Sequence, residues 1–163
     1  MSLFDLTGKS VLITGSSKGI GKSIATRYAE HGAKVIISSR TSETCIDTAD
    51  EINTSIGKEL AYPIPCNISH QEELEDLVSK TREIIGKIDV LVCNAATNTH
   101  MGSMLDMPIE AFDKVMNNNI RSNQILSNLV IPEMVERNDG AVIIVSSIAA
   151  LRGSSILGAY NIS

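Results

Sequence analysis

The chain has 163 residues, of which 43% are hydrophobic and 20% are charged, and its formal net charge is −5. A chain of this length can bury one sizeable core, so we expect one domain covering residues 1–163. The negative charge argues against nucleic acid as the main partner, because binding to a phosphate backbone requires clustered Lys and Arg. No apolar run approaches the roughly 20 residues of a membrane-spanning helix, so no membrane association is expected.

The amino terminus and the cysteines bear on the cellular compartment. Residues 1–5 show no basic segment leading into an apolar run, so no secretory signal is visible and we expect a cytoplasmic protein. The three cysteines are Cys45, Cys66 and Cys93. Their odd number and wide spacing fit neither a disulfide framework nor a zinc site, so we predict reduced, buried thiols and no metal.

Short β-rich runs alternate with longer stretches of helical periodicity. The predicted strands are Ser10–Thr14, Lys34–Ser39, Leu60–Pro65, Ile88–Cys93 and Ala141–Ser146. The predicted helices are Ile20–His31, Ser42–Ile56, Gln71–Ile85 and a long stretch, Pro108–Arg137. Most of these strands are almost continuously apolar, as expected when helices cover both faces of a parallel sheet. The pattern predicts an α/β fold.

Glycines and prolines mark the predicted helix ends. Gly32, Gly57 and Gly86 follow the first three helices and suit a C-cap with left-handed backbone geometry. Pro108 suits a first helical turn, whereas Pro132 is predicted to kink or break the long helix.

The first strand runs directly into a glycine-rich turn, Thr14–Gly21, with the sequence TGSSKGIG. Glycines at a strand-to-helix junction permit a tight turn and let a pyrophosphate approach the free N–H groups of the helix start. The turn therefore predicts dinucleotide binding. A nucleoside triphosphatase loop is the alternative, because Gly21-Lys22-Ser23 is similar to the end of a Walker motif. That motif needs a glycine where Ser16 stands, so the spacing argues strongly against it.

Further segments resemble the short-chain dehydrogenase/reductase family, and the likeness runs from Leu6 to the last residue. Asp89–Ala96, with the sequence DVLVCNAA, is similar to the family's DxLVNNAG segment, although Cys93 and Ala96 replace Asn and Gly. Ser147 and Tyr160 stand 13 residues apart, which is the family's spacing between its catalytic serine and tyrosine. The Asn-Ala-Ala and Tyr-Asn-Ile-Ser segments look most like the NADPH-dependent carbonyl reductase subgroup.

Asn119 matches the family's catalytic asparagine, which lies in the helix after the fourth strand. The neighbouring Asn117 and Asn118 leave the local register open, and Phe112–Val115 together with Ile120 favours Asn119. A run of exposed or capping amides is the alternative interpretation.

The resemblance implies a Rossmann-type doubly wound parallel sheet with strand order 3-2-1-4-5, and an oxidoreductase that interconverts a carbonyl and an alcohol. Tyr160 would exchange a proton with the substrate oxygen, Ser147 would hydrogen-bond the same oxygen, and Asn119 would help to hold a water of the proton relay. The residues implied in cofactor binding are Gly15, Ser17, Lys18, Gly19, Ile20, Gly21, Ser39, Arg40, Asn67, Ile68, Asn94, Ala95, Ala96 and Tyr160.

The end of the second strand predicts NADP rather than NAD. A site that prefers NAD places Asp or Glu there to bind the ribose 2′-hydroxyl. Ser38-Ser39-Arg40 occupies the place, so Arg40 can pair with the 2′-phosphate and Lys18 can add a second charge. A solvent-facing Arg40 is the alternative. Asn67 stands where the family usually has an Asp near the adenine amine, and we expect its side-chain oxygen to accept that hydrogen bond.

The family also has a lysine four residues after the tyrosine, which favours ionisation of a phenol that otherwise titrates near about pH 10. The sequence ends at Ser163, before that position. We therefore expect a longer parent protein with further strands and helices, and an inactive 163-residue chain that binds cofactor weakly if at all; a natural short form is the alternative. Without those elements Ile125, Leu126, Leu129 and Val130 are expected to be exposed.

Two function classes follow. The first is an NADP(H)-dependent oxidoreductase acting on a small-molecule carbonyl or alcohol, which the resemblance implies to be a homodimer or homotetramer when intact. The second is a catalytically inactive nucleotide-binding or scaffolding protein of the same fold.

Overall fold

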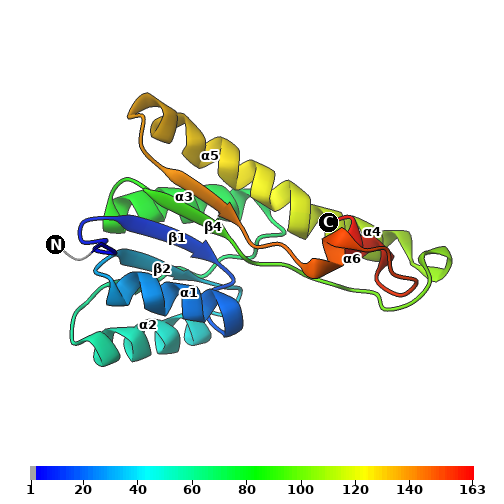
Figure 1. Ribbon diagram of the computed structural model, residues 1–163, viewed down its shortest axis with the longest axis horizontal. Coiled ribbons are helices and arrows are strands. Elements are labelled where there is room, and N and C mark those ends of the chain that lie inside the picture. Colours follow the sequence, from blue (N-terminus) through cyan, green and yellow to red (C-terminus); the bar gives the residue numbers. More distant parts are fainter. Residues whose placement is uncertain (1–2) are drawn as a thin grey trace.

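The computed structural model describes residues 3–163, and a five-stranded parallel sheet forms its centre (Figure 1). The strands are β1 (Ser10–Thr14), β2 (Lys34–Ser38), β3 (Ala61–Pro63), β4 (Val90–Cys93) and β5 (Ala141–Ile144). Their order is β3-β2-β1-β4-β5, which confirms the prediction of a Rossmann-type sheet. β1 has the predicted bounds, and the other four strands are shorter than predicted.

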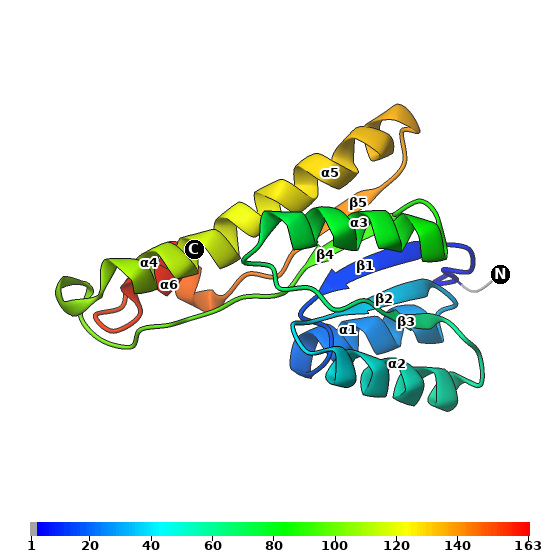
Figure 2. The same ribbon diagram turned by 180° about the vertical axis from the view of Figure 1, so that it is seen from behind.

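Helices cover both faces of the sheet (Figures 1 and 2). They are α1 (Gly19–Glu30), α2 (Ser42–Ile56), α3 (Gln71–Ile85), α4 (Ile109–Met116), α5 (Ser122–Glu136) and α6 (Gly158–Asn161), with a π-helical segment η2 (Asn117–Arg121) and 3₁₀ turns η1 (Met104–Asp106) and η3 (Ile148–Leu151). α2 and α3 have the predicted bounds. Gly57 is the C-cap residue of α2 with the predicted left-handed geometry, Gly86 is the C-cap residue of α3 with positive φ but a ψ of −146°, and Gly32 follows the C-cap residue of α1. None of the helices within residues 3–163 is long and apolar enough to cross a membrane.

The alternation of side chains along β1 divides the core into two layers. Leu12 packs in the layer that contains residues of α3 and α5, whereas Val11 and Ile13 pack in the layer that contains residues of α1 and α2. All five residues of β1 are buried, because β1 lies in the middle of the sheet and has helices on both sides.

The edge strand β5 differs from β1. Val92 of β4 pairs with Ile13 on one side and with Ile143 on the other, so the two isoleucines occupy the same row of the sheet. Ile13 is 0% exposed and Ile143 is 42% exposed. β5 therefore forms an incompletely covered edge of the sheet, as expected from the sequence.

The helix that follows β4 is continuous and corrects one expectation. α4, η2 and α5 follow one another without a gap, and Pro132 lies inside α5. Pro132 was predicted to kink or break the helix, and the break does not occur. A proline removes the hydrogen bond to the carbonyl four residues earlier, and here that residue, Asn128, is exposed, so water can satisfy the carbonyl.

The apolar positions of α5 correct a second expectation. Leu126 and Val130 are fully buried, and Ile125 and Leu129 pack partly buried against the same core layer. They were expected to be exposed, but α3 lies on this face of the sheet and contacts α5. The exposed apolar side chains of α5 are instead Ile131 and Val135.

Candidate active site

A cleft of about 330 Å³ lies at the carboxyl ends of β1, β2, β3 and β4, where an open parallel sheet binds its ligands. Twelve of its lining residues are among those predicted for cofactor binding: Gly15, Ser17, Lys18, Ile20, Gly21, Ser39, Arg40, Asn67, Ile68, Asn94, Ala95 and Ala96. Three others, Cys66, Thr97 and Asn118, were not predicted. The structure thus brings together in one cleft residues that lie far apart in the sequence.

The glycine turn fits closely against the end of β4. A Cβ atom on Gly21 would lie 2.3 Å from the Gly15 carbonyl oxygen and 2.5 Å from Nδ2 of Asn94. Asn94 donates hydrogen bonds through this nitrogen to the carbonyl oxygens of Thr14 (2.9 Å) and Gly15 (3.0 Å). Gly21 therefore has no room for a side chain, and its absence lets the start of α1 pack against the ends of β1 and β4.

Thr14 joins the ends of β1 and β4. Its hydroxyl oxygen accepts hydrogen bonds from the backbone N–H groups of Asn94 and Ala95, both at 3.1 Å. This threonine was identified only as part of the turn motif. Its role in holding the β4 segment becomes visible once the two strands are paired.

Buried hydroxyl groups attach the glycine turn to its neighbours. Ser16 donates to the carbonyl oxygen of Ile13 (2.8 Å) and accepts from the N–H of Ser38 (2.8 Å). Thr48 of α2 donates to the carbonyl oxygen of Ser17 (2.9 Å). Ser16, which is incompatible with a Walker motif, thus ties the turn to β2.

Two cations border the cleft beside β2. Lys18 and Arg40 are both exposed, and neither has a hydrogen-bonding or ionic side-chain partner within residues 3–163. None of the residues that line the cleft is an Asp or a Glu. This part of the cleft therefore attracts an anionic group.

The loop after β3 forms the far wall of the cleft. The N–H of Asn67 donates to the carboxylate of Glu73 (2.6 Å), and this bond together with the His70 ring lowers the pKa of Glu73. Oδ1 of Asn67 accepts from the N–H of Ser69 (3.2 Å) and retains a second lone pair for a ligand.

A second, smaller cavity of about 50 Å³ contains the three predicted catalytic residues. Asn119, Ser147 and Tyr160 line it, together with Ala95 and Ala96, which also line the larger cleft. The remaining lining residues are Asn123, Ile144, Val145, Ser146, Ala150 and Ser163. The two cavities thus adjoin at the segment after β4.

The hydroxyl groups of this cavity have free hydrogen-bonding capacity. Oγ of Ser147 accepts from the N–H of Ala149 (3.1 Å), so its proton can be donated elsewhere. The hydroxyl of Tyr160 has no hydrogen-bond partner within residues 3–163. None of the residues that line the cavity is a Lys or an Arg.

Asn119 braces the segment that follows β4. Asn119 is buried, with 6% of the residue exposed. Its Oδ1 accepts from the N–H of Thr97 (2.8 Å), and its Nδ2 donates to the carbonyl oxygen of Thr97 (2.9 Å) and to Oγ of Ser163 (2.9 Å). Both amide N–H groups are engaged, and one lone pair of Oδ1 remains for a water. The π-helical turn η2 brings Asn118 and Asn119 inward together, which a regular helical pattern does not predict.

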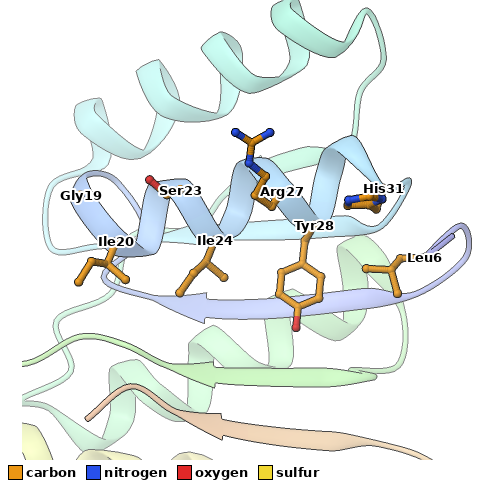
Figure 3. Close-up of a pocket in the computed structure, with 8 residues that line it drawn as sticks. All are labelled: Leu6, Gly19, Ile20, Ser23, Ile24, Arg27, Tyr28 and His31. Atoms are coloured by element: carbon orange, nitrogen blue, oxygen red, sulfur yellow. The ribbon is translucent and has the colours of Figure 1, made fainter. Parts of the chain in front are cut away.

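A hollow larger than either of these cavities lies along α1 (Figure 3). It has a volume of about 770 Å³ and is lined by Leu6, Gly19, Ile20, Ser23, Ile24, Arg27, Tyr28 and His31. Ile20, Ile24 and Tyr28 recur every four residues and project from one side of the helix (Figure 3). Gly19, predicted to contact the cofactor, lines this groove and not the cleft; Ile20 lines both.

The three cysteines are free and buried, as predicted. Burial raises the pKa of Cys66 to about 12 and that of Cys93 to about 11, so both thiols stay protonated at neutral pH. Residues 3–163 contain no group of three or more His, Cys, Asp or Glu side chains that could hold a metal ion.

Comparison with known proteins identifies the family. The model of the family described as short chain dehydrogenase matches residues 9–163. The chain belongs to the short-chain dehydrogenase family. Members of this family are oxidoreductases that use NAD or NADP.

Similar curated proteins extend beyond the length of this chain. Dehydrogenase/reductase SDR family member 4 of Bos taurus is 38% identical over 159 residues, which is 97% of this chain and 56% of that protein. Dehydrogenase/reductase SDR family member 2, mitochondrial, of Homo sapiens is 40% identical over 158 residues, or 97% of this chain and 55% of that protein. The chain therefore spans little more than half the length of these relatives.

Solved structures show the same fold. A 7 alpha-hydroxysteroid dehydrogenase in complex with NADH and 7-oxo glycochenodeoxycholic acid matches with a TM-score of 0.90 and 33% identity, covering 97% of this chain and 60% of that one. A short-chain type dehydrogenase/reductase from Mycobacterium marinum matches with a TM-score of 0.89 and 33% identity, covering 98% of this chain and 65% of that one.

Proposed function

We propose that the protein is an NADP(H)-dependent oxidoreductase that interconverts a carbonyl and an alcohol, with Asn119, Ser147 and Tyr160 as its polar catalytic groups. One observation carries this proposal: these three side chains line one cavity that shares Ala95 and Ala96 with the dinucleotide cleft. A substrate in the small cavity would then meet the reactive end of a dinucleotide in the cleft.

The residues of the cleft suit a dinucleotide. Gly15 and Gly21 line the cleft at the start of α1, where N–H groups of a helix N-terminus suit a pyrophosphate, and the bound cofactor would supply the hydride. Ser147 has a free proton with which to hold the substrate oxygen as negative charge develops. The Tyr160 hydroxyl exchanges a proton with the same oxygen, and the remaining lone pair of Asn119 holds a water in the relay.

The preference for NADP rests on Lys18 and Arg40. Both side chains lack partners within residues 3–163, and both border a cleft with no carboxylate in its lining. A guanidinium binds a phosphate through two parallel hydrogen bonds, so Arg40 is suited to the 2′-phosphate. The similar 7 alpha-hydroxysteroid dehydrogenase was solved with NADH, which is a ligand of that protein and does not set the preference proposed for this one.

Cofactor titrations of the full-length protein test the preference. Wild type should bind NADPH at least about tenfold more tightly than NADH, the effect of one charge-assisted contact, and Arg40→Asp should abolish or reverse that ratio. Equal affinity of wild type for NADPH and NADH would refute the NADP assignment.

Turnover tests the enzymatic role. NADPH oxidation is to be measured with a panel of aldehydes, ketones and quinones, because the ketone bound in the similar 7 alpha-hydroxysteroid dehydrogenase is a ligand of that enzyme only. Tight NADPH binding without turnover of any member of the panel would favour the alternative, a catalytically inactive nucleotide-binding or scaffolding protein.

We further propose that the full-length protein is a homodimer or homotetramer in the cytoplasm. Exposed Ile131 and Val135 on α5 support self-association, and three free buried thiols suit a reducing compartment. Light scattering that gives a monomer mass would refute the first part. Localisation to mitochondria would refute the cytoplasmic assignment; the human relative, family member 2, is named as mitochondrial.

A further inference from the structure

The three consecutive asparagines of η2, Asn117, Asn118 and Asn119, make different hydrogen bonds. Asn117 donates from Nδ2 to the carbonyl oxygen of Ser69 (3.0 Å), and Asn119 bonds to Thr97. Asn118 accepts at Oδ1 from the hydroxyl of Ser69 (2.8 Å). The π-helical turn thus connects the catalytic cavity to the loop after β3, which forms the far wall of the dinucleotide cleft.

Asn118 is nearly buried and has an unused donor. The residue is 7% exposed and lines the dinucleotide cleft. Its Oδ1 is engaged by Ser69, whereas Nδ2 has no hydrogen-bond partner within residues 3–163. Nδ2 is not among the fully buried polar atoms without a partner, so it is accessible, and a ligand in the cleft with an acceptor beside Nδ2 can take up this free donor.

The position of Asn118 indicates which half of the dinucleotide it meets. The catalytic cavity lies at the end of β5, and the cationic pair Lys18 and Arg40 lies beside β2. The contact with Ser69 directs the Asn118 side chain toward the β3 loop, on the side of Asn67 and away from Tyr160. A dinucleotide with its nicotinamide at β5 would have its adenosine half at this wall.

We propose that Asn118 is a specificity-determining contact for the adenosine half of NADP(H), in which Nδ2 donates to a ring nitrogen of adenine while Ser69 fixes the carboxamide. This inference rests on the proposed function, because it requires a bound dinucleotide. Adenine offers both an amine donor and ring-nitrogen acceptors. Asn67 provides the acceptor for the amine, and Asn118 provides a donor for the ring.

Asn117 supplies a matched control. Like Asn118 it lies in η2 and hydrogen-bonds Ser69, but it does not line the cleft. Asn117→Leu therefore removes an anchor of the same loop without removing the proposed ligand contact. Asn118→Leu removes the donor, and Asn118→Asp keeps the shape and the oxygen that accepts from Ser69 while replacing the donor with a second acceptor.

The experiment measures, in the full-length protein, the affinity for NADPH and for adenosine 2′,5′-bisphosphate, together with kcat at saturating NADPH. We expect Asn118→Leu and Asn118→Asp to weaken both ligands by the same factor, on the order of 10-fold, which corresponds to one lost hydrogen bond. We expect kcat to remain within about twofold of wild type, because the contact is to the adenosine half of the cofactor and does not touch the substrate. Asn117→Leu should leave both affinities within about twofold of wild type.

Two results would overturn the inference. One is wild-type affinity for both ligands in the folded Asn118 variants. The other is a fall in kcat with unchanged affinity for the bisphosphate, which would mean that Asn118 acts only through Asn119. If Asn118→Leu does not fold, Asn118→Asp alone decides between these results. Failure of wild type to bind NADPH would refute the proposed function instead, so the two failures are distinguishable.

Discussion

Two regions of the sheet, the strands β1 and β2 and the edge strand β5, differ in how far other elements within residues 3–163 bury them. β1 and all but the first residue of β2 are buried between helices, and the cleft at their carboxyl ends contains the glycine turn, two exposed cations and a polar wall. β5 is largely exposed, and the cavity at its end has serine and tyrosine hydroxyls but no cation in its lining. The difference teaches that the proposed nucleotide site and the proposed proton-transfer site lie in separate parts of the protein, so substitutions can test them separately.

The largest expected effect separates chemistry from binding. Tyr160→Phe in the full-length protein should lower kcat by about 10²- to 10⁴-fold, because it removes the proton donor. NADPH affinity should remain within about threefold, since the cleft keeps its other lining residues. Stopped-flow and binding measurements check both; an unchanged kcat would remove Tyr160 from the mechanism.

The two isoleucines that flank Val92 test the packing difference directly. In a polypeptide of residues 1–163, Ile13→Ala should lower the free energy of unfolding by about 2–5 kcal/mol, because Ile13 is fully buried. Ile143→Ala should cost about 1 kcal/mol or less, because Ile143 is partly exposed. Urea unfolding measures both values. Equal losses would mean that the edge strand is covered, for example by self-association, and a concentration series would detect that.

Gly21 tests the cradle of the nucleotide end. Gly21→Ala should destabilise the fold by about 1–3 kcal/mol and weaken NADPH binding, because the added Cβ would overlap the Gly15 carbonyl and Asn94. Gly153→Ala is the control, since a Cβ there meets nothing within 4 Å, and it should change stability by no more than about 0.5 kcal/mol. Similar behaviour of the two variants would contradict the close fit of the turn.

The sequence predicts the nucleotide end better than the catalytic end. The bounds of β1, α2 and α3 follow from periodicity, because these depend on local spacing, whereas the strand order and most residues that meet in the cleft were implied by the family resemblance. The burial of Leu126 and Val130 was missed, since it depends on the distant α3. Asn118 was missed because its direction depends on a π-helical turn, for which the run of asparagines gave only an ambiguous signal.

The smallest expected effect concerns the buried thiol of Cys93 at the end of β4. Burial raises its pKa to about 11, so the folded state keeps the proton longer than the unfolded state does. The resulting stability is fully present below the unfolded pKa of about 8.5 and is lost as pH rises toward 11, by about 1 kcal/mol per pH unit. Cys93→Ala should therefore show a shallower fall of unfolding free energy between pH 8 and 10, measured by urea titration, and a slope equal to that of wild type would contradict this.

The most direct test of the difference between the two ends is NADPH oxidation by a polypeptide of residues 1–163, compared with the full-length protein under the same conditions. Circular dichroism first establishes that both samples are folded. We predict turnover by the full-length protein and none by residues 1–163, because no cation lines the cavity of Tyr160 and none would anchor the nicotinamide ribose. Robust turnover by a folded sample that ends at Ser163 would contradict the account.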